Sequence, residues 1–254
     1  MPFVSTGSFQ LLREGFPEQP ELGPALSRVL LDQVAAGDRP ATIRLSRPGR
    51  VVAFGRRDVR SEGYPVAVKA ARDAGFDAME RLTGGRAAAY SEGGISLTMT
   101  IPDLSPAERT NKRFVEAAEV ARSALAGLGI DARTGEVPGE YCPGDFSVNA
   151  RGEVKLVGIG QRMVKGAAHV GFVIVVNGSD LIREVLEPVY GALGLDWNPQ
   201  TVGAIEDEVP GADRALVESA LLERIGANHR LERITLDEAT LDSAKQIASD
   251  YRSP

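Results

Sequence analysis

The sequence is poor in the residues that carry most redox and metal chemistry. Its 254 residues include one cysteine and two histidines. One cysteine cannot form an internal disulfide, so a reducing compartment, the cytoplasm, is expected. The histidines, His169 and His229, are well separated and show no ligand spacing with the cysteine, so no metal site is expected.

Long apolar runs and net positive charge are also missing. The longest apolar run, "GFVIVV" at 171–176, is far too short to cross a bilayer, and the N-terminus does not read as a signal peptide, so no membrane association is expected. A net charge of −6 argues against generic nucleic-acid binding. Residues 44–86 nevertheless carry ten basic side chains against five acidic ones. Such a segment suits a small anionic ligand or an acidic protein partner, or consists simply of solvated arginines.

The apolar pattern predicts an α+β fold, because strands occur in pairs while helices are interspersed without regular alternation. In "GGISLTMTIP" (93–102) apolar residues alternate with Ser96, Thr98 and Thr100, which predicts a half-buried strand. The sequence predicts further strands within 41–55, 145–164 and 169–176, and helices at 20–37, 64–76 and 105–129, the last capped by Ser105.

The whole chain, 1–254, is predicted to form a single catalytic domain. The segment from about 180 to 254 has seven basic residues against fifteen acidic ones and is expected to be helical and to pack onto the rest. No tandem repeat, low-complexity tract or clear linker divides the sequence.

Three segments are candidates for a functional site, and the first is "RLTGGRAAAY" (81–90). Its two glycines and three alanines leave the backbone nearly bare, so a ligand could approach closely and bond to backbone N–H groups. Arg81 and Arg86 flank the glycines and could pair with a phosphate or a carboxylate. A turn between strands, with small residues packed beneath it, would give the same pattern.

The second candidate is "VKLVGIGQR" (154–162), where Lys155 interrupts an apolar strand. A lysine removed from water changes its pKa readily and can move a proton or stabilise a developing oxyanion. Gly158 and Gly160 thin the same strand, as expected where a ligand or another segment lies against it. The alternative is a lysine at a strand edge whose amine reaches water.

The third candidate is the cysteine, Cys142, in "EYCPGDF" (140–146). A lone intracellular cysteine is more often structural than catalytic, but Gly139, Pro143 and Gly144 place this one in a loop. A nearby cationic Lys155 would lower the pKa of the thiol and make it reactive. On a straight hairpin the two residues would lie about 20 Å apart, at about 3.3 Å per residue. A Cys142–Lys155 pair therefore requires the loop to fold back over the sheet.

In this order, the segments resemble the superfamily of lipoate–protein ligases and octanoyltransferases, whose fold is shared with biotin–protein ligases. "VVAFGRR" is similar to the family's strand before the ligand loop, and "RLTGGRAAAYSEGG" to its Arg-x-Ser-Gly-Gly-x-Ala loop. "VKLVGIGQR", which includes Gln161, resembles its Lys-x-x-Gly-x-x-Gln/Tyr-Arg strand, and "AAHVGFVIVV" resembles the strand after it. The likeness covers roughly 20–180 and implies a mixed sheet with flanking helices.

"GEYCPGDFSV" is most similar to the branch that moves octanoyl groups between lipoyl-bearing proteins. The resemblance implies that Cys142 takes the acyl group as a thioester and passes it to a lysine of a lipoyl domain, with Lys155 stabilising the thiolate or the acyl carbonyl. It implies an acyl-binding or cofactor-binding set, which consists of Arg81, Thr83, Gly84, Gly85, Arg86, Ala87, Gly158, Gln161 and His169. The implied partners are lipoyl-domain proteins, namely the 2-oxoacid dehydrogenase E2 component and the glycine-cleavage H protein, or an acyl carrier protein.

The chain departs from the family pattern at three places. Arg86 stands where ligases carry a third glycine, Tyr90 and Ser91 align with a His-Asp pair, and Val170 replaces one histidine of a His-His-Gly sequence. These changes favour acyl transfer without a cofactor over ligation driven by ATP and Mg²⁺. A ligase that uses Lys155 without needing Cys142, and a catalytically reduced acyl-binding or carrier-binding protein, remain as alternatives.

Overall fold

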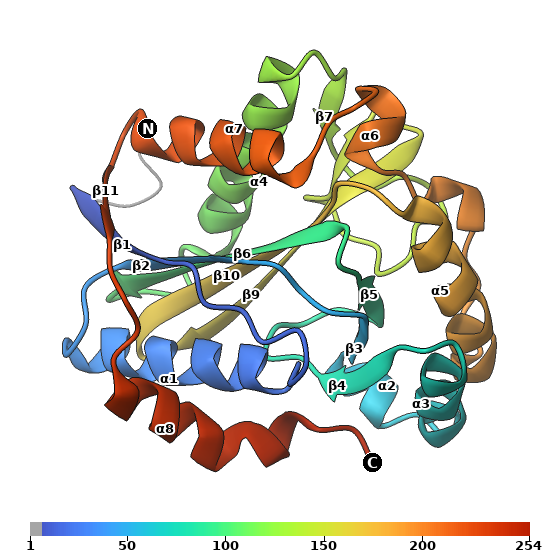
Figure 1. Ribbon diagram of the computed structural model, residues 1–254, viewed down its shortest axis with the longest axis horizontal. Helices are drawn as coiled ribbons and strands as arrows, with labels where there is room; N and C mark the ends of the chain where they lie inside the picture. The colour runs from blue at the N-terminus through green and yellow to red at the C-terminus, as the bar shows by residue number, and fades with distance from the viewer. Residues whose placement is uncertain (1–6) are drawn as a thin grey trace.

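The computed structural model of the protein describes residues 7–254 and has an α+β architecture (Figure 1). An eight-stranded mixed sheet has the strand order β11-β1-β2-β6-β10-β9-β8-β7, and a three-stranded sheet has the order β4-β3-β5. The strands are β1 Ser8–Leu12, β2 Thr42–Ser46, β3 Val51–Phe54, β4 Asp77–Glu80, β5 Ala88–Tyr90, β6 Gly94–Asp103, β7 Ala132–Thr134, β8 Val148–Ala150, β9 Val154–Val164, β10 Gly166–Val175 and β11 Arg230–Arg233.

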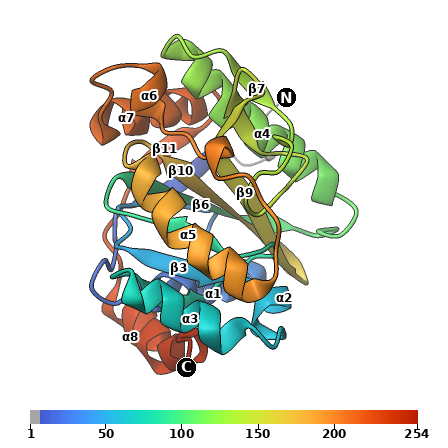
Figure 2. The same cartoon turned by 90° about the vertical axis from the view of Figure 1, so that its right-hand side faces the viewer.

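Helices cover both faces of the large sheet. In Figure 1, α4 and α7 lie above it, while α1 lies below it with α8 beneath α1. The small sheet packs with α3 and α5, which lie on the side of the molecule that faces the viewer in Figure 2. The helices are α1 Leu22–Ala36, α2 Arg56–Val59, α3 Tyr64–Asp73, α4 Thr110–Gly127, α5 Ser179–Leu193, α6 Ile205–Glu208, α7 Arg214–Gly226 and α8 Glu238–Ile247, with 3₁₀ turns at Pro199–Thr201 and Ala248–Tyr251. None of the helices within residues 7–254 is long and apolar enough to span a membrane.

The predicted helices at 20–37 and 64–76 are confirmed as α1 and α3, and the predicted strand at 93–102 as β6. The hairpin at 145–164 is confirmed as β8 and β9. The two strands within 41–55 are also present, but β2 belongs to the large sheet and β3 to the small one. The turn "SRPGR" therefore leads the chain from one sheet to the other.

The prediction that β6 is half-buried was wrong. Its apolar residues pack against α4 and α7, as alternation requires, but Thr98 and Thr100 on the opposite face are buried as well, with 8% and 1% of their surfaces exposed. This polar face is covered because α1 crosses it and contacts both β6 and β10. A sequence pattern shows which residues share a face, but not whether another element covers that face.

Two other expectations need correction. Ser105 does not cap a helix: α4 begins at Thr110, and the Ser105 backbone N–H donates to the side chain of Asp103 instead. The C-terminal segment is mostly helical, as predicted, but it also contains β11, which pairs in parallel with β1 at the edge of the large sheet. Because β11 has only four residues, its sequence carries too little periodicity to reveal it.

Candidate functional site

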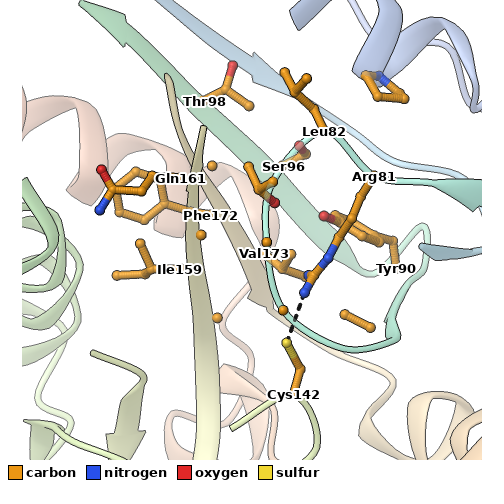
Figure 3. A pocket seen from close by; sticks show the side chains of 18 of the residues that line it. Arg81, Leu82, Tyr90, Ser96, Thr98, Cys142, Ile159, Gln161, Phe172 and Val173 are labelled. Atoms are coloured by element: carbon orange, nitrogen blue, oxygen red, sulfur yellow. Dashed lines mark hydrogen bonds between the residues drawn. The ribbon is translucent and has the colours of Figure 1, made fainter. Parts of the chain in front are cut away.

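A cavity of about 540 Å³ lies against the polar face of the large sheet (Figure 3). Its floor is made by Ser96 and Thr98 of β6, by His169 of β10, and by Gly158 and Gly160 of β9. The start of α1, the glycine loop after β4 and the loop that precedes β8 complete its walls. A volume of this size suits a small-molecule ligand.

Cys142 reaches this cavity from the loop between β7 and β8. Its φ of +43° is unusual for a residue with a side chain, and only Arg151 shares this property among the described non-glycine residues. The Cys142 backbone N–H donates to Tyr190 Oη at 2.7 Å, and this hydroxyl donates to the Ala87 carbonyl at 2.9 Å. Such a conformation costs about 1–3 kcal/mol and persists only where surrounding contacts enforce it. Here Tyr190 enforces it.

The thiol of Cys142 accepts hydrogen bonds from two donors. Arg81 Nη2 lies 3.1 Å from Sγ, as Figure 3 shows, and the backbone N–H of Arg86 lies 3.3 Å from it. Burial raises the pKa of Cys142, but the positive charges of Arg81 and, second, Lys155, together with these hydrogen bonds, outweigh burial and leave the pKa below its ordinary value. A larger thiolate fraction makes the cysteine a better nucleophile at neutral pH.

Lys155 lies beside Cys142, so the loop does fold back over the sheet. Its Nζ donates to the carbonyl oxygens of Cys142 at 2.8 Å and Tyr141 at 3.1 Å, and to Glu140 Oε1 at 3.0 Å. Lys155 thus contacts the main chain of the cysteine, whereas the contact with Sγ comes from Arg81. The sequence had assigned the role of thiol partner to Lys155, and the geometry gives the direct contact to Arg81.

Sequence reasoning missed Glu140, which organises the loop around the cysteine. The carboxylate is 3% exposed and accepts from the backbone N–H groups of Val137 and Gly144 and from Ser147 Oγ at 2.6 Å. It also forms an ion pair with Lys155, which is 1% exposed. A buried lysine needs a carboxylate partner. The position of Glu140, two residues before the cysteine, was therefore the signal from which this partner could have been found.

The two glycines of the loop 81–90 have different roles. A Cβ atom on Gly85 would lie 1.9 Å from Arg81 Nη2 and 2.8 Å from Cys142 Sγ, so no side chain fits between the guanidinium and the thiol. Gly85 also has a φ of +111°, which favours glycine. Gly84 and Thr83 line the cavity, and Thr83 lies directly over Gly160 of β9.

Two expected members of the channel lie outside it. Ala87 is fully buried, and its carbonyl accepts from Tyr190 instead of facing the cavity. The side chain of Arg86 turns away and pairs with the buried carboxylate of Asp58 at 3.2 Å, so only its backbone faces the thiol. In an irregular loop the side chains do not alternate between two faces as they do in a strand, so the sequence could not tell which of these residues point inward.

Gln161 and His169 both line the cavity, and each has a hydrogen-bond partner within the protein. Gln161 accepts from Arg113 and donates to the Thr110 carbonyl, which ties β9 to α4. His169 Nδ1 lies 3.1 Å from Thr100 Oγ1. Burial, and after it the charge of Arg44, lowers the pKa of His169 to about 3, so its imidazole is neutral at physiological pH.

The charged lining of the cavity is mostly positive. Asp145 is the one carboxylate among the described lining residues, against Arg44, Arg47, Arg81 and Lys155. Within residues 7–254, no three His, Cys, Asp or Glu side chains are grouped as a metal site would require. The positive lining suits an anionic or carbonyl-bearing ligand.

Comparison with known proteins gives one consistent result. Residues 19–225 match the family described as lipoyl protein ligase A/B catalytic domain. The octanoyl-[GcvH]:protein N-octanoyltransferase of Geobacillus kaustophilus is 27% identical over 194 residues, which are 76% of this chain and 68% of that protein.

Solved structures share the fold. A lipoate-protein ligase A crystallised with ATP has a TM-score of 0.74 at 20% identity, over 96% of this chain and 94% of that one. A bipartite lipoate protein ligase of Thermoplasma acidophilum, studied with its E2 lipoyl domain, has a TM-score of 0.72 at 19% identity, over 96% of this chain and 92% of that one. At these identities the likeness establishes the α+β fold with its mixed sheet and flanking helices.

Proposed function

The chain belongs to the lipoyl protein ligase A/B catalytic domain family, and from that premise we propose that it is an acyltransferase that uses Cys142 as its nucleophile. The substrate is a medium-length acyl group, octanoyl or lipoyl, which moves onto a lysine of a lipoyl domain. The observation that carries the proposal is the contact between Arg81 Nη2 and Cys142 Sγ at the wall of the cavity.

The first step forms the thioester. The thiolate of Cys142 attacks the carbonyl carbon of an acyl group held on a lysine of the donor protein. As the S–C bond forms, the C–N bond of the donor breaks. The departing amine takes up a proton from solvent, which balances the proton that the thiol released when it ionised. Arg81 and the N–H of Arg86 hold the sulfur before attack. We expect these donors to turn to the acyl oxygen as negative charge develops on it.

The second step reverses the roles. The amine of the recipient lysine attacks the thioester carbonyl, so a C–N bond forms and the S–C bond breaks. The thiolate of Cys142 returns to its hydrogen bonds with Arg81 and Arg86, and the amine loses its proton to solvent. Because one amide replaces another, the transfer needs no ATP.

Lys155 and Glu140 act as positioning residues in this scheme. Lys155 Nζ contacts the Cys142 carbonyl and not its sulfur, and Glu140 fixes the loop on both sides of the cysteine. Their ion pair supports the loop, in addition to the hydrogen bond from the Cys142 N–H to Tyr190. The positive charge of Lys155 adds to the lowering of the thiol pKa, second to Arg81.

The name of the relative from Geobacillus kaustophilus gives GcvH as the acyl donor, and we extend this donor to the present chain. Lipoyl domains of 2-oxoacid dehydrogenase E2 components are the proposed recipients. The positive lining of the cavity and the basic segment 44–86 suit an acidic partner. We place the reaction in the cytoplasm, where the one cysteine stays reduced.

Intact-protein mass spectrometry tests the proposal. The protein is incubated with octanoyl-GcvH or with an octanoyl-loaded acyl carrier protein, and wild type is compared with Cys142→Ala. We expect wild type to gain one octanoyl group that hydroxylamine removes, and the variant to gain none. Addition of an unmodified lipoyl domain should then move the group from Cys142 to that domain.

Two other results would contradict acyl transfer. Lipoylation that requires ATP and survives Cys142→Ala would identify a ligase. Absence of any adduct and of any lipoylation, with tight binding of an octanoyl carrier, would identify a binding protein in which Cys142 is structural. The variant Arg60→Met serves as a matched control, because it removes an exposed arginine outside the cavity lining and should still form the adduct.

A further inference from the structure

Asp145 is an unpartnered carboxylate in the lining of a cavity whose other charged side chains are positive. It is exposed, and it belongs to the same loop as Cys142. Among the residues that the structure describes, none donates to its carboxylate or forms an ion pair with it. The charge of Lys155, by contrast, is met inside the protein by Glu140. The carboxylate of Asp145 is therefore free to bind a cation that comes from outside.

The turn that carries Asp145 is held in place by its neighbours. The backbone N–H of Ser147 donates to the Gly144 carbonyl at 3.0 Å. Glu140 accepts from the Gly144 N–H at 3.1 Å and from Ser147 Oγ at 2.6 Å. Phe146 stacks on an aromatic ring of α4, with the ring centroids 5.0 Å apart. Because these contacts fix the turn without the carboxylate, Asp145 has a defined position three residues from the cysteine.

The two lysines of the proposed reaction reach the cavity with different charges. The donor lysine carries the acyl group as an amide and is neutral. The recipient lysine has a free amine with an ordinary pKa of about 10.4, so it arrives as an ammonium ion. The positive charges of Arg47 and Arg81 in the lining repel such a cation. A negative group in the lining therefore helps the second step, whereas the neutral donor of the first step does not need it.

We propose that Asp145 binds the ammonium group of the recipient lysine and holds it beside the thioester at Cys142. The lysine releases a proton to solvent, its nitrogen attacks the thioester carbonyl, and the nitrogen becomes positive again as the C–N bond forms. A second proton then leaves to solvent as the S–C bond breaks and the thiolate returns. The carboxylate stabilises the positive charge before and during the attack. This inference rests on the proposed function, because it assigns recognition of the recipient to one side chain of the same site.

An acid that is merely solvated would show a different arrangement. Glu136, in the same loop between β7 and β8, is also exposed but lies outside the cavity lining. Asp145 is both exposed and part of the lining, so a group that enters from solvent can reach it. A role in activating the thiol is not needed, because the charges that lower the pKa of Cys142 are those of Arg81 and Lys155.

Single-turnover transfer from a loaded cysteine isolates the second step. Cys142 is loaded with octanoyl-N-acetylcysteamine, a small thioester whose thiol leaves as the new thioester forms. The loaded protein is mixed with an unmodified lipoyl domain, with hexylamine, which is a cation at neutral pH, or with hydroxylamine, which is neutral there. We expect Asp145→Asn to slow transfer to the lipoyl domain and to hexylamine about tenfold, mainly through a higher half-saturating concentration. The rate with hydroxylamine should not change.

Three controls accompany this variant. Asp145→Glu keeps the charge and should recover most of the lost rate. Glu136→Gln removes an exposed acid from the same loop and should match wild type with all three acceptors. For Asp145→Asn itself, the pH midpoint of iodoacetamide alkylation and the midpoint of urea unfolding should equal those of wild type, since the carboxylate has no partner inside the protein.

Three results would overturn the inference. Equal transfer to the lipoyl domain by wild type and Asp145→Asn would show that the carboxylate does not bind the lysine. A slower reaction with hydroxylamine as well would indicate a displaced loop. A loss with the lipoyl domain but not with hexylamine would mean that Asp145 contacts the surface of the domain and not its lysine.

Failure of the proposed function gives a different result. If wild type gains no octanoyl group at Cys142, acyl transfer itself is contradicted, and the inference falls with it. If wild type is loaded and passes the group on, and Asp145→Asn does so equally well, only the role of Asp145 is contradicted.

Discussion

Replacement of Arg81 by methionine should make Cys142 less reactive at neutral pH. The substitution keeps an unbranched apolar side chain but removes the charge and the hydrogen bond from Nη2 to Sγ at 3.1 Å. Burial, which raises the thiol pKa, would then be opposed only by Lys155 and the Arg86 N–H, so the pKa must rise. A hydrogen bond to a charged group is worth about 1.5–3 kcal/mol, and the lower value corresponds to about a tenfold smaller thiolate fraction.

Alkylation by iodoacetamide, followed by intact mass as a function of pH, measures this directly. In wild type the rate should reach its plateau at a lower pH than in an ordinary thiol, and Arg81→Met should move the midpoint upward. The plateau rate itself should stay level or increase, because a thiolate of higher pKa is the stronger nucleophile. A variant that had merely lost its fold would not show this combination.

The matched control is Arg60→Met, which removes an exposed arginine outside the cavity lining. Its alkylation profile should coincide with that of wild type. The reasoning is refuted if Arg81→Met leaves the midpoint in place, or if both variants move it equally. The second result would mean that general positive charge, and not the direct contact, sets the reactivity of the thiol.

Three further predictions concern the support of the site. Glu140→Gln leaves Lys155 buried without a counter-charge, so the free energy of unfolding in urea should fall by about 3–5 kcal/mol, and the double variant with Lys155→Met should recover part of it. Burial lowers the pKa of His169 from 6.5 to about 3, so the contribution of His169 to stability should be constant above pH 6.5 and fall by up to ~1.4 kcal/mol per pH unit below it. His169→Gln should flatten that slope below pH 6.5, and an unchanged slope would contradict the assignment. Gly160→Val places a Cβ 3.0 Å from Thr83 Oγ1 and should slow acylation about 10- to 100-fold, because it displaces the glycine loop 81–90. The midpoint of urea unfolding should stay the same, and full activity would contradict the role of this cavity in acyl binding.

The sequence predicted those parts of the molecule whose signals are local. The periodicity of α1, α3 and β6 is strong because each buries a continuous apolar stripe, so their positions follow from spacing alone. The order of the motifs indicated the family resemblance, and the structure brings the loop around Gly85 and the strand around Lys155 to the lining of one cavity.

Contacts between distant segments could not be predicted in the same way. Spacing on a hairpin separates Cys142 from Lys155, and the loop overcomes that separation because Glu140 binds groups on both of its sides. The identity of the thiol partner depends on a further contact, since Arg81 approaches from another sheet. Neither contact has a periodicity or a spacing that a reader of the sequence could recognise.

The departure from the family pattern at Arg86 illustrates how a change in sequence can leave the chemistry intact. Its side chain points away from the cavity and pairs with Asp58, whose other oxygen accepts from the Gly55 N–H. A Cβ on Gly55 would in turn lie 1.9 Å from the Gly85 carbonyl, so this wall holds the glycine loop in place from behind. The arginine thus anchors the outer side of the loop, while its backbone N–H still faces the sulfur, as a third glycine would allow. For acyl transfer at Cys142 the backbone matters more than the side chain, and the backbone donor is retained.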